Sequence, residues 1–410
     1  MPRFIVTFRR YVSFAAITAF LKVLVVNVLM LIDRLKGRRV IILDLEEVTL
    51  LPFISPVIRQ LQISTNKLSY YTGYKTVCPA IDGVNSDYYH TFNYKLSKCM
   101  YAANMFLSPH IWGEAPERVV KVHMPHGHPV KFACLPKEPF EKYDVHFLTG
   151  LLHRQQTEFT IAYYGIKKDI SLLDVGLPKS DKLLSGHYRR QAILEEFGLC
   201  SDKPTVLYAP SWEEGLSLRA FGLQLFDQLA LLTEFNVLVK LHPGSCVPES
   251  HPSYDFYTGG TNWQMVVDRY LSRKNIRNII SDDIDPLLAA SDIMITDISG
   301  AALEFLLMKK PVIYIDCPDF FETTLPGLYK NYGPTTAEYI KNDPKSNAGR
   351  HVGFLVEKIT DLASTVRFAI NTPGYKMHER ELFVEKIRYN NGTAAKSAAD
   401  NILKVIGISN

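Results

Sequence analysis

The sequence predicts an α/β protein built from two Rossmann-like domains, each with a doubly wound parallel sheet. Short apolar runs alternate with helical segments along most of the chain, which is the pattern of buried strands joined by crossover helices. Several runs end in polar clusters followed by a helix start, and in such sheets ligands bind outside the carboxyl ends of the strands. A chain of 410 residues exceeds one ordinary core, so two domains and an appendage are expected.

Composition places the chain among ordinary globular proteins. Hydrophobic residues make up 47% and charged residues 21%, which argues against disorder. The net charge is only +4, and no arginine-rich or aromatic-interleaved face indicates a nucleic-acid partner. The six cysteines form no CxxC pair, as in reduced cytosolic proteins, which disfavours both a disulfide framework and a zinc site. We expect neither a metal nor a cofactor.

Residues 1–38 form a separate segment that we expect to associate with a membrane. Tyr11–Ile32 is almost wholly apolar, interrupted mainly by Lys22 and Asn27, and about 20 such residues suffice to span a bilayer. Basic flanks also suit a helix lying in an anionic leaflet, and the positive-inside rule places the protein at the cytoplasmic face. The flanking residues are Arg3, Arg9, Arg10, Arg34, Lys36, Arg38 and Arg39. A buried helix of the first domain remains the alternative.

Residues 39–197 are expected to form the first domain. Its apolar runs predict five strands, and helical segments lie between and after them. The strands are Arg39–Leu45, Lys67–Tyr74, Phe106–Pro109, Val119–His123 and Tyr143–Leu148. The helices are Leu50–Leu61, His153–Tyr164 and a segment that ends near Phe197, before the natural stop at Gly198.

The fourth predicted strand of this domain ends in a loop that carries three histidines. His126 is held between prolines beside Gly127, which permits a tight turn and close backbone approach. A histidine so held at the carboxyl end of a strand can act as a general base near neutral pH. We therefore predict that His126 is functional, while His123, inside the strand, is structural and His128 is undecided.

Residues 198–380 are expected to form the second domain, a nucleotide-binding fold. The predicted strands are Pro204–Pro210, Val237–Leu241, Asn278–Ile280, Ile293–Thr296 and Val312–Ile315. Neither a GxGxxG fingerprint nor a Walker A sequence occurs in the chain, which disfavours a dehydrogenase and a P-loop enzyme.

Polar clusters at three strand ends of the second domain predict a site for a phosphate-bearing ligand. Ser299 and Gly300 begin a helix that runs to about residue 308, and free N–H groups at a helix start bind phosphate. Lys240 or His242 would lie across from them. The other predicted donor-side residues are Asp297, Pro210, Ser211 and Glu304. Glu304 would accept hydrogen bonds from ribose hydroxyls or, alternatively, only pack at the helix surface.

Five separated motifs in one order resemble those of the CDP-glycerol glycerophosphotransferase family, which makes teichoic acids and related polymers. They are Pro125–Lys131, Gly176–Asp181, Leu207–Glu213, Lys240–Pro243 and Thr296–Gly300. The resemblance implies a GT-B architecture, in which two Rossmann-like domains face a cleft, with residues 381–410 forming a helix that packs back towards the first domain. It also implies attachment to the cytoplasmic face of the cell membrane.

The resemblance implies residue roles as well. His126 would deprotonate the acceptor hydroxyl, with Gly127, His128 and Lys131 on the acceptor side. His242 would contact the diphosphate of CDP-glycerol or a related CDP-polyol, and Ser299 with the Gly300 amide would bind phosphate. The acceptor would be a lipid-linked molecule or a polymer, and CMP would leave without a covalent intermediate.

The motifs also depart from the family pattern. Pro125 stands in place of tryptophan, His128 of threonine, Glu213 of arginine and Gly300 of a second serine. Glu213 puts an anion where a phosphate-facing cation is expected, which leaves the activated alcohol open to ribitol phosphate or a sugar phosphate. Two other classes stay open: a GT-B nucleotide-sugar glycosyltransferase or UDP-sugar epimerase-like enzyme, and a non-catalytic membrane scaffold.

Overall fold

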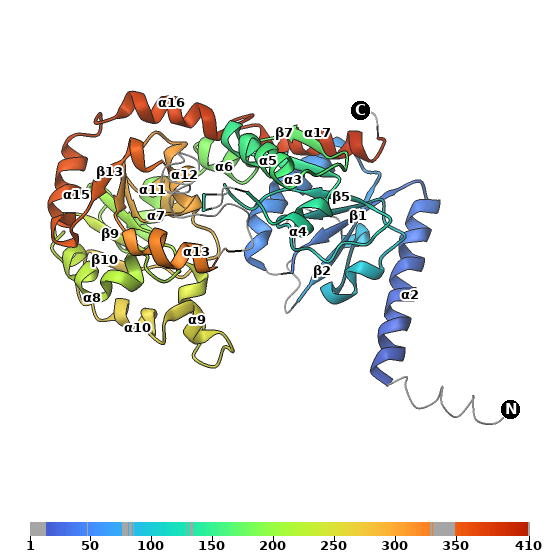
Figure 1. Ribbon diagram of the computed structural model, residues 1–410, viewed down its shortest axis with the longest axis horizontal. Coiled ribbons are helices and arrows are strands. Elements are labelled where there is room, and N and C mark those ends of the chain that lie inside the picture. The colour runs from blue at the N-terminus through green and yellow to red at the C-terminus, as the bar shows by residue number, and fades with distance from the viewer. Residues whose placement is uncertain are drawn as a thin grey trace.

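The computed structural model describes residues 14–46, 48–75, 81, 84, 86–128, 130–131, 134–328, 330 and 349–408. The predicted basic flank at Arg3, Arg9 and Arg10 lies outside these residues, as do the start of the apolar segment at Tyr11 and the loop residue Pro129. The described chain forms two α/β halves joined side by side, and a long helix, α2, lies along the outer side of the N-terminal half (Figure 1).

The N-terminal half contains a seven-stranded sheet in the order β3-β2-β1-β4-β5-β6-β7. Its strands are β1 Arg39–Asp44, β2 Leu68–Tyr74, β3 Tyr89–Asn93, β4 Met105–Ser108, β5 Val120–His123, β6 Val145–Leu148 and β7 Ser171–Asp174. Its helices are α2 Phe14–Leu35, α3 Leu51–Ser64, α4 Lys137–Glu141 and α5 Leu151–Tyr164. The chain then passes through α6 Ser180–Leu184 to α7 Arg190–Glu196, which packs in the core of the C-terminal half. The pairs between neighbouring strands are parallel, so their carboxyl ends share one edge.

The C-terminal half contains a six-stranded parallel sheet in the order β10-β9-β8-β11-β12-β13. Its strands are β8 Thr205–Tyr208, β9 Asn236–Val239, β10 Ile276–Asn278, β11 Ile293–Thr296, β12 Val312–Ile315 and β13 Phe354–Val356. Its helices are α8 Ser217–Ala230, α9 Tyr254–Thr258, α10 Trp263–Asp268, α11 Asp285–Ala290, α12 Gly300–Leu306, α13 Leu325–Leu328, α15 Leu362–Asn371 and α16 Met377–Ile387, and the last helix of the chain is α17 Ala394–Val405. Two parallel sheets with intervening helices confirm the predicted α/β class.

Three strands were missed by the sequence prediction, and each lies at the edge of a sheet. These are β3, β7 and β13. An edge strand is paired on one side only and is partly exposed, so its sequence lacks the continuous apolar run of a central strand. In β7 the four residues are exposed or half-buried, whereas all four residues of the central strands β8 and β11 are buried.

The last helix returns to the N-terminal half, where α17 packs on α3 (Figure 1). Its buried face, which includes Ala398 and Ile402, joins the core beneath β1 and β4. The chain reaches this position by crossing close to the N-terminal sheet, where Tyr389 N donates to Thr149 O at 2.8 Å. Gly176 has a positive φ of 94°, and a Cβ there would collide with the Tyr389 carbonyl, so this crossing requires glycine.

Two residues of the Gly176–Asp181 motif connect parts of the fold. The Asp181 carboxylate accepts hydrogen bonds from Ala394 N at 3.0 Å and Ala395 N at 2.7 Å, which caps the start of α17. Lys179 reaches the C-terminal half, as described below. This motif therefore fastens the returning helix and the second domain to the first.

Candidate active site

The carboxyl edges of the two sheets face each other. An ion pair joins Lys131 of the first half to Glu213 of the second. A second ion pair joins Lys179 Nζ to Glu304 Oε2 at 2.7 Å. The backbone also comes close, because a Cβ at Gly300 would lie 3.5 Å from the carbonyl oxygen of His128. The loops that carry the predicted catalytic and donor-side residues therefore meet at one junction.

The hydrogen bonds of His126 leave its Nε2 unprotonated, as a general base requires. Its backbone N and its Nδ1 both lie within hydrogen-bond distance of the Pro109 carbonyl, at 3.0 Å and 2.8 Å. A carbonyl only accepts, so Nδ1 carries the hydrogen and Nε2 keeps its lone pair. Burial lowers the pKa of His126, and the neighbouring His110 lowers it further. The side chain is nevertheless exposed, so a substrate can reach it.

His242 is held in the other neutral tautomer, with its hydrogen on Nε2. Its Nδ1 accepts a hydrogen bond from Gly244 N at 3.0 Å, so the hydrogen of the neutral ring sits on Nε2. Burial lowers the pKa of His242 to about 4, and the charges of Lys131 and Lys240 add to this effect. His242 therefore presents a neutral N–H donor, and its side chain is exposed like that of His126.

Glu213 lies opposite the cation that follows the histidine loop. Its side chain is 1% exposed and pairs with Lys131. Burial alone would raise the pKa of Glu213, but the attraction of Lys131 outweighs burial and lowers it. The anion that replaces the family's arginine is thus neutralised by Lys131, a residue predicted to lie on the acceptor side.

The predicted phosphate-binding turn begins α12. Ser299 is the N-cap of this helix, and its Oγ accepts from Ala302 N at 3.3 Å and lies 3.2 Å from Thr296 Oγ1. Ser299 and Gly300 are both half-buried, so they remain open to a ligand.

Four other predicted donor-side residues are internal. Asp297 is buried and accepts from Ser211 N, Ser217 N, Ser217 Oγ and Ile298 N. Ser211 Oγ in turn donates to Ile298 O at 2.6 Å, and Pro210 is buried beside it. Lys240 Nζ donates to the Leu241 carbonyl at 3.0 Å. These residues hold the loops of the donor edge in place.

Glu304 belongs to a buried ionic cluster between the two halves. Lys179 Nζ lies 2.7 Å from Glu304 Oε2 and 2.6 Å from Asp285 Oδ1. Burial alone would lower the pKa of Lys179, but the two carboxylates raise it. Burial also raises the pKa of Asp285 to about 7. The pKa of Lys179 and the pKa of Asp285 are both raised because the single charge of Lys179 can balance only one of the two buried carboxylates.

Two neighbours of His126 have different surroundings. A Cβ at Gly127 would meet no atom within 4 Å, so packing among the described residues does not require glycine there. His128 is buried, its Nδ1 lies 3.1 Å from Thr149 Oγ1, and burial lowers its pKa to about 4. His128 therefore lies behind the exposed edge that His126 occupies.

The sequence interpretation missed the polar network at the ends of β1 and β4. Asp44, Ser108 and His110 meet there, with Ser108 Oγ 2.8 Å and His110 Nε2 3.4 Å from Asp44 Oδ2. Both strands are apolar runs that end in a polar residue, the same signal that located the donor edge. The contact itself depends on β1 and β4 being neighbours, which the sequence does not state.

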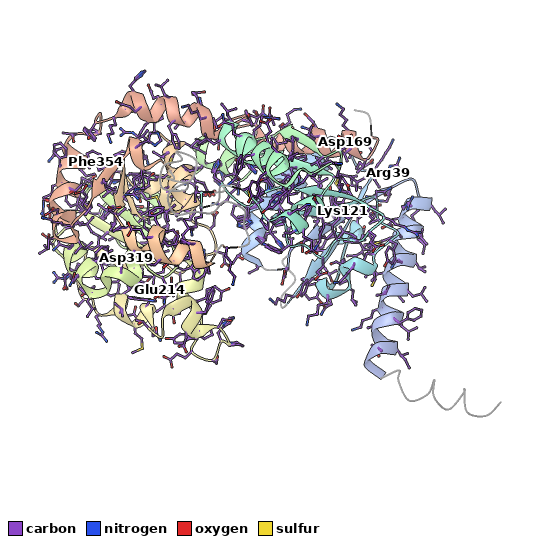
Figure 2. All side chains as sticks on the ribbon, in the orientation of Figure 1. Arg39, Lys121, Asp169, Glu214, Asp319 and Phe354 are labelled. Atoms are coloured by element: carbon purple, nitrogen blue, oxygen red, sulfur yellow. The ribbon has the colours of Figure 1, made fainter. Side chains whose placement is uncertain are left out.

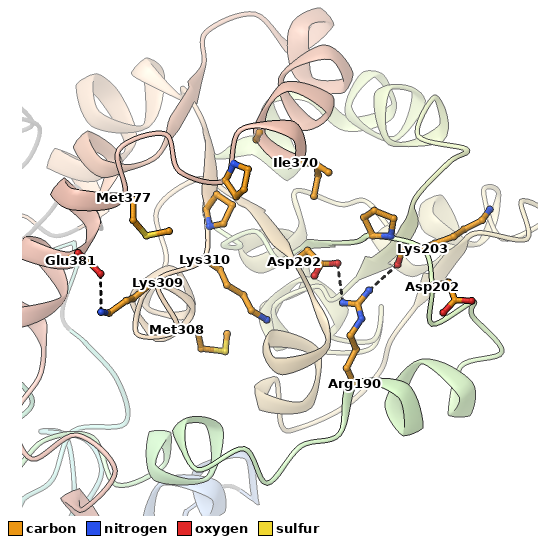
Figure 3. A pocket seen from close by; sticks show the side chains of 14 residues that line it. Arg190, Asp202, Lys203, Asp292, Met308, Lys309, Lys310, Ile370, Met377 and Glu381 are labelled. Carbon is orange, nitrogen blue, oxygen red and sulfur yellow. Dashed lines mark hydrogen bonds and ion pairs between the residues drawn. The ribbon is translucent and has the colours of Figure 1, made fainter.

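The pocket in Figure 3 lies elsewhere. It has a volume of about 740 Å³ and is lined by residues that include Lys203, Pro204, Lys310 and Pro311. Because Pro204 and Pro311 precede β8 and β12, this pocket lies at the amino edge of the sheet, opposite the histidines. Its charged residues also form ion pairs among themselves, such as Arg190 with Asp292. Ligands of parallel sheets bind at the carboxyl edge, so we place the active site there.

Within the described ranges, no group of three or more histidine, cysteine, aspartate or glutamate side chains is arranged to hold a metal ion. At the junction His126 and His242 are exposed, and Lys131, Ser299 and Gly300 are half-buried.

Two facing Rossmann-like halves with parallel sheets define a GT-B-like architecture. Residues 138–343 match the family described as CDP-Glycerol:Poly(glycerophosphate) glycerophosphotransferase, about half of the chain, and the chain belongs to this family. The match confirms the family that the five motifs predicted and makes the chain a member of an enzyme family. The loop of His126 lies before the matched range.

Curated relatives carry related names. A teichoic acid poly(glycerol phosphate) polymerase of Bacillus spizizenii is 24% identical over 250 residues, 54% of this chain and 58% of the relative. A teichoic acid glycerol-phosphate transferase of Staphylococcus aureus is 24% identical over 249 residues, 57% of this chain and 54% of the relative. The chain spans about half the length of these two relatives.

Solved structures agree on the fold. The wall teichoic acid polymerase TagF has a TM-score of 0.63 at 16% identity, with 90% of this chain and 89% of that chain covered. A Staphylococcus aureus MnaA–UDP complex has a TM-score of 0.54 at 14% identity, with 90% of this chain and 98% of that chain covered. These likenesses confirm the GT-B-like architecture.

Proposed function

We propose that the protein transfers glycerol phosphate, or a related polyol phosphate, from a CDP-activated donor to a hydroxyl of a lipid-linked or polymer acceptor. The product would belong to a cell-envelope glycopolymer, and CMP would leave. The observation that carries this proposal is the opposite polarity of two exposed histidines on facing edges: His126 has a free lone pair and His242 a free N–H. A transfer to a hydroxyl needs one group of each kind.

The chemistry follows from these positions. His126 Nε2 accepts the proton of the acceptor hydroxyl as its oxygen forms a bond to the phosphorus that bears glycerol. The bond from that phosphorus to the bridging oxygen breaks, and its electron pair leaves with CMP. His242 Nε2–H, Ser299 and the Gly300 amide donate hydrogen bonds to the diphosphate as charge develops on it. His242 is neutral because burial lowers its pKa to about 4, so it contributes a dipole, not a charge.

Glycerol is our first choice for the transferred unit, on the strength of the family and the names of its relatives. Ribitol is the second, because a teichoic acid ribitol-phosphate polymerase of Staphylococcus aureus is 27% identical over 205 residues, 43% of this chain and 33% of that relative. For a UDP-sugar enzyme the support is a likeness in fold alone. A non-catalytic scaffold would have no use for the opposite polarity of the two histidines.

A donor panel tests the proposal. The protein is incubated with a membrane extract and CDP-glycerol, CDP-ribitol or a UDP-sugar, and the released nucleotide is measured. We expect CMP from a CDP-polyol and a loss of about 10²–10⁴-fold for His126→Ala, the usual contribution of a general base. His242→Ala should also lose turnover. His251→Ala is the matched control, because His251 Nδ1 accepts from Ser253 N at 3.1 Å in the same kind of turn. UDP release, or wild-type rates in both alanine variants, would refute the proposal.

We also propose that α2 attaches the protein to the cytoplasmic surface of the cell membrane. Its segment Ala16–Leu35 has a mean hydropathy of 2.1, and 11% of the residues in its apolar window are buried. Figure 2 shows that one side of α2 carries side chains that face away from the rest of the protein. The large apolar side chains exposed on the helix include Phe20, Leu24 and Val28.

The inner face of α2 supports a helix lying in the membrane surface. Asn27 donates to Cys99 O at 2.8 Å and accepts from Ala102 N at 3.0 Å. Further along, Asp33 accepts from the Tyr71 hydroxyl at 2.9 Å. A helix bound to a polar domain from Asn27 onwards cannot also cross a hydrocarbon core of about 30 Å. Deleting residues 1–36 should move the protein from vesicles of anionic lipid to the soluble fraction in a flotation assay. A wild-type chain that does not float with vesicles would contradict this proposal.

A further inference from the structure

The N-terminal sheet has a second polar site at its centre, where the strand order reverses between β1 and β4. Asp44 ends β1 and Ser108 ends β4. Asp44 is 2% exposed and Ser108 is fully buried. Such reversal points are where ligands of doubly wound sheets bind, yet these side chains are too deeply buried to contact a substrate. Their contacts run instead towards His126.

Asp44 holds the turn that follows β4. Ser108 Oγ lies 2.8 Å from Asp44 Oδ2 and accepts from His110 N at 3.3 Å. His110 Nδ1 accepts from Trp112 N at 3.2 Å, so its hydrogen sits on Nε2, which lies 3.4 Å from Asp44 Oδ2. The turn is closed so tightly that a Cβ at Gly113 would lie 2.5 Å from the same oxygen.

The residue between Ser108 and His110 supplies the carbonyl that orients His126. Pro109 O accepts from His126 N at 3.0 Å and lies 2.8 Å from His126 Nδ1. Both neighbours of Pro109 are bound to Asp44, so the position of this carbonyl depends on Asp44. The carbonyl in turn decides which nitrogen of His126 carries the hydrogen.

We propose that Asp44 is the positioning residue for His126, acting through Ser108 and the Pro109 carbonyl, and that it does so as a neutral acid. This inference rests on the proposed role of His126 as the base. It assigns a function to three residues that none of the five motifs contains.

Hydrogen counting supports the neutral form. The Ser108 hydroxyl has one hydrogen but two oxygens within reach, Asp44 Oδ2 at 2.8 Å and His110 O at 2.7 Å. If Asp44 is protonated, it donates to Ser108, and Ser108 donates to His110 O. If Asp44 is ionised, Ser108 must turn to it and release His110 O. Burial raises the pKa of Asp44 to about 7, with the carboxylates of Glu46 and Glu114 acting in the same direction, while the bonds from Ser108 and from the Glu46 backbone lower it.

The surroundings of Asp44 predict a pH effect on turnover. The other groups that face it are His110 and the Tyr143 hydroxyl, which donates to His110 O at 2.8 Å. As the pH rises through about 7, Asp44 loses its proton, the Ser108–His110 bond is lost, and kcat should fall. In Asp44→Asn the amide NH₂ takes the place of the acid O–H towards Ser108 and does not titrate, so the alkaline fall of kcat should disappear.

The test compares isosteric variants of the full-length protein in the CMP-release assay with CDP-glycerol. Asp44→Leu should lower kcat about 10- to 100-fold without changing KM for CDP-glycerol, the effect of a misplaced catalytic group. Ser108→Ala is the milder variant and should lower kcat in the same direction, which keeps the test valid if Asp44→Leu does not fold. Ser291→Ala is the matched control for Ser108→Ala, because Ser291 is also a fully buried serine and its Oγ donates to Leu287 O at 2.7 Å, away from both histidines. A kcat within twofold of wild type in Asp44→Leu or Ser108→Ala, or a change in KM alone, would overturn the proposal.

A second readout separates this inference from the proposed function. In ¹⁵N-histidine NMR spectra, with the signal assigned by its loss in His126→Gln, wild-type His126 should show the Nδ1–H form. Asp44→Leu and Ser108→Ala should show a mixture of both forms. If the wild type releases no CMP, the proposed function fails and the spectra alone decide. An unchanged Nδ1–H form in both variants would then overturn the role of Asp44.

Discussion

The carboxyl edges of the two sheets use the same device and give it different chemistry. Each edge has a buried aspartate at the point where the strand order reverses, Asp44 beside β4 and Asp297 beside β8. Asp297 accepts four hydrogen bonds, three of them from backbone N–H groups. Burial raises the pKa of Asp297, and the bonds from these donors act against that rise. Asp44 has fewer donors, and burial raises its pKa to about 7.

The difference shows how one architecture supports two tasks. A carboxylate surrounded by donors is a fixed anchor, and Asp297 keeps the loops at Ser211 and Ser299 in one arrangement for the donor. A buried acid with few donors exchanges its proton near neutral pH, and the bonds around Asp44 reach the nitrogen that must take a proton. The acceptor edge is therefore expected to respond to pH more strongly than the donor edge.

The largest effect should come from removing the cation that holds the two edges together. Lys179→Met leaves the buried carboxylates of Asp285 and Glu304 without their partner, which should cost about 3–5 kcal/mol of unfolding free energy. Urea unfolding followed by tryptophan fluorescence measures the loss. Lys182→Met, a half-buried position on the same short helix, is the control. Equal stability of the two variants would show that the ionic cluster does not hold the edges together.

The next effect concerns Asp44 and depends on pH. Below about pH 4 the carboxyl is protonated in both the native and unfolded states, since its ordinary pKa is 3.8. Between about pH 4 and 7 the native state keeps the proton and the unfolded state loses it, so wild-type stability falls as the pH rises. Asp44→Asn titrates in neither state. Its stability relative to wild type should therefore increase by up to about 1.4 kcal/mol per pH unit in this window. Urea unfolding at pH 4 and pH 8 measures the difference, and a constant difference would contradict a neutral Asp44.

The same substitution at the donor edge should have the opposite sign. In Asp297→Asn an NH₂ group replaces one acceptor oxygen and faces two donors, leaving buried N–H or O–H groups unpaired. We expect a loss of about 1–3 kcal/mol, and the difference from wild type should change less between pH 4 and 7 than for Asp44→Asn. The same urea measurements apply. A stabilised Asp297→Asn variant would mean that the two aspartates are equivalent, and the comparison of the edges would fail.

Central strands were predictable from the sequence, and the contacts that give the site its chemistry were not. Ile293–Thr296 and Val312–Ile315 were predicted with the bounds that the structure shows, because strands buried on both faces are continuous apolar runs. The polarity of His126 depends on a carbonyl 17 residues away, and the Asp44–Ser108 bond joins residues 64 apart. Such pairings depend on which strands are neighbours in the sheet, and no local pattern in a single sequence shows this order.

The smallest effect tests whether the donor edge needs its departure from the family pattern. Gly300 stands where the family has a second serine, and a Cβ there would lie 3.5 Å from His128 O, an ordinary van der Waals distance. Gly300→Ser should therefore fold with a stability within about 0.5 kcal/mol of wild type. Its hydroxyl, at the start of α12, would add a donor for phosphate, so KM for CDP-glycerol should fall while kcat keeps its pH profile. Gly176→Ser is the contrasting control and should destabilise the protein, because a Cβ there collides with the Tyr389 carbonyl. A large loss of stability in Gly300→Ser would show that the two edges lie closer together than packing at His128 indicates, and that glycine is required where the acceptor edge and the donor edge meet.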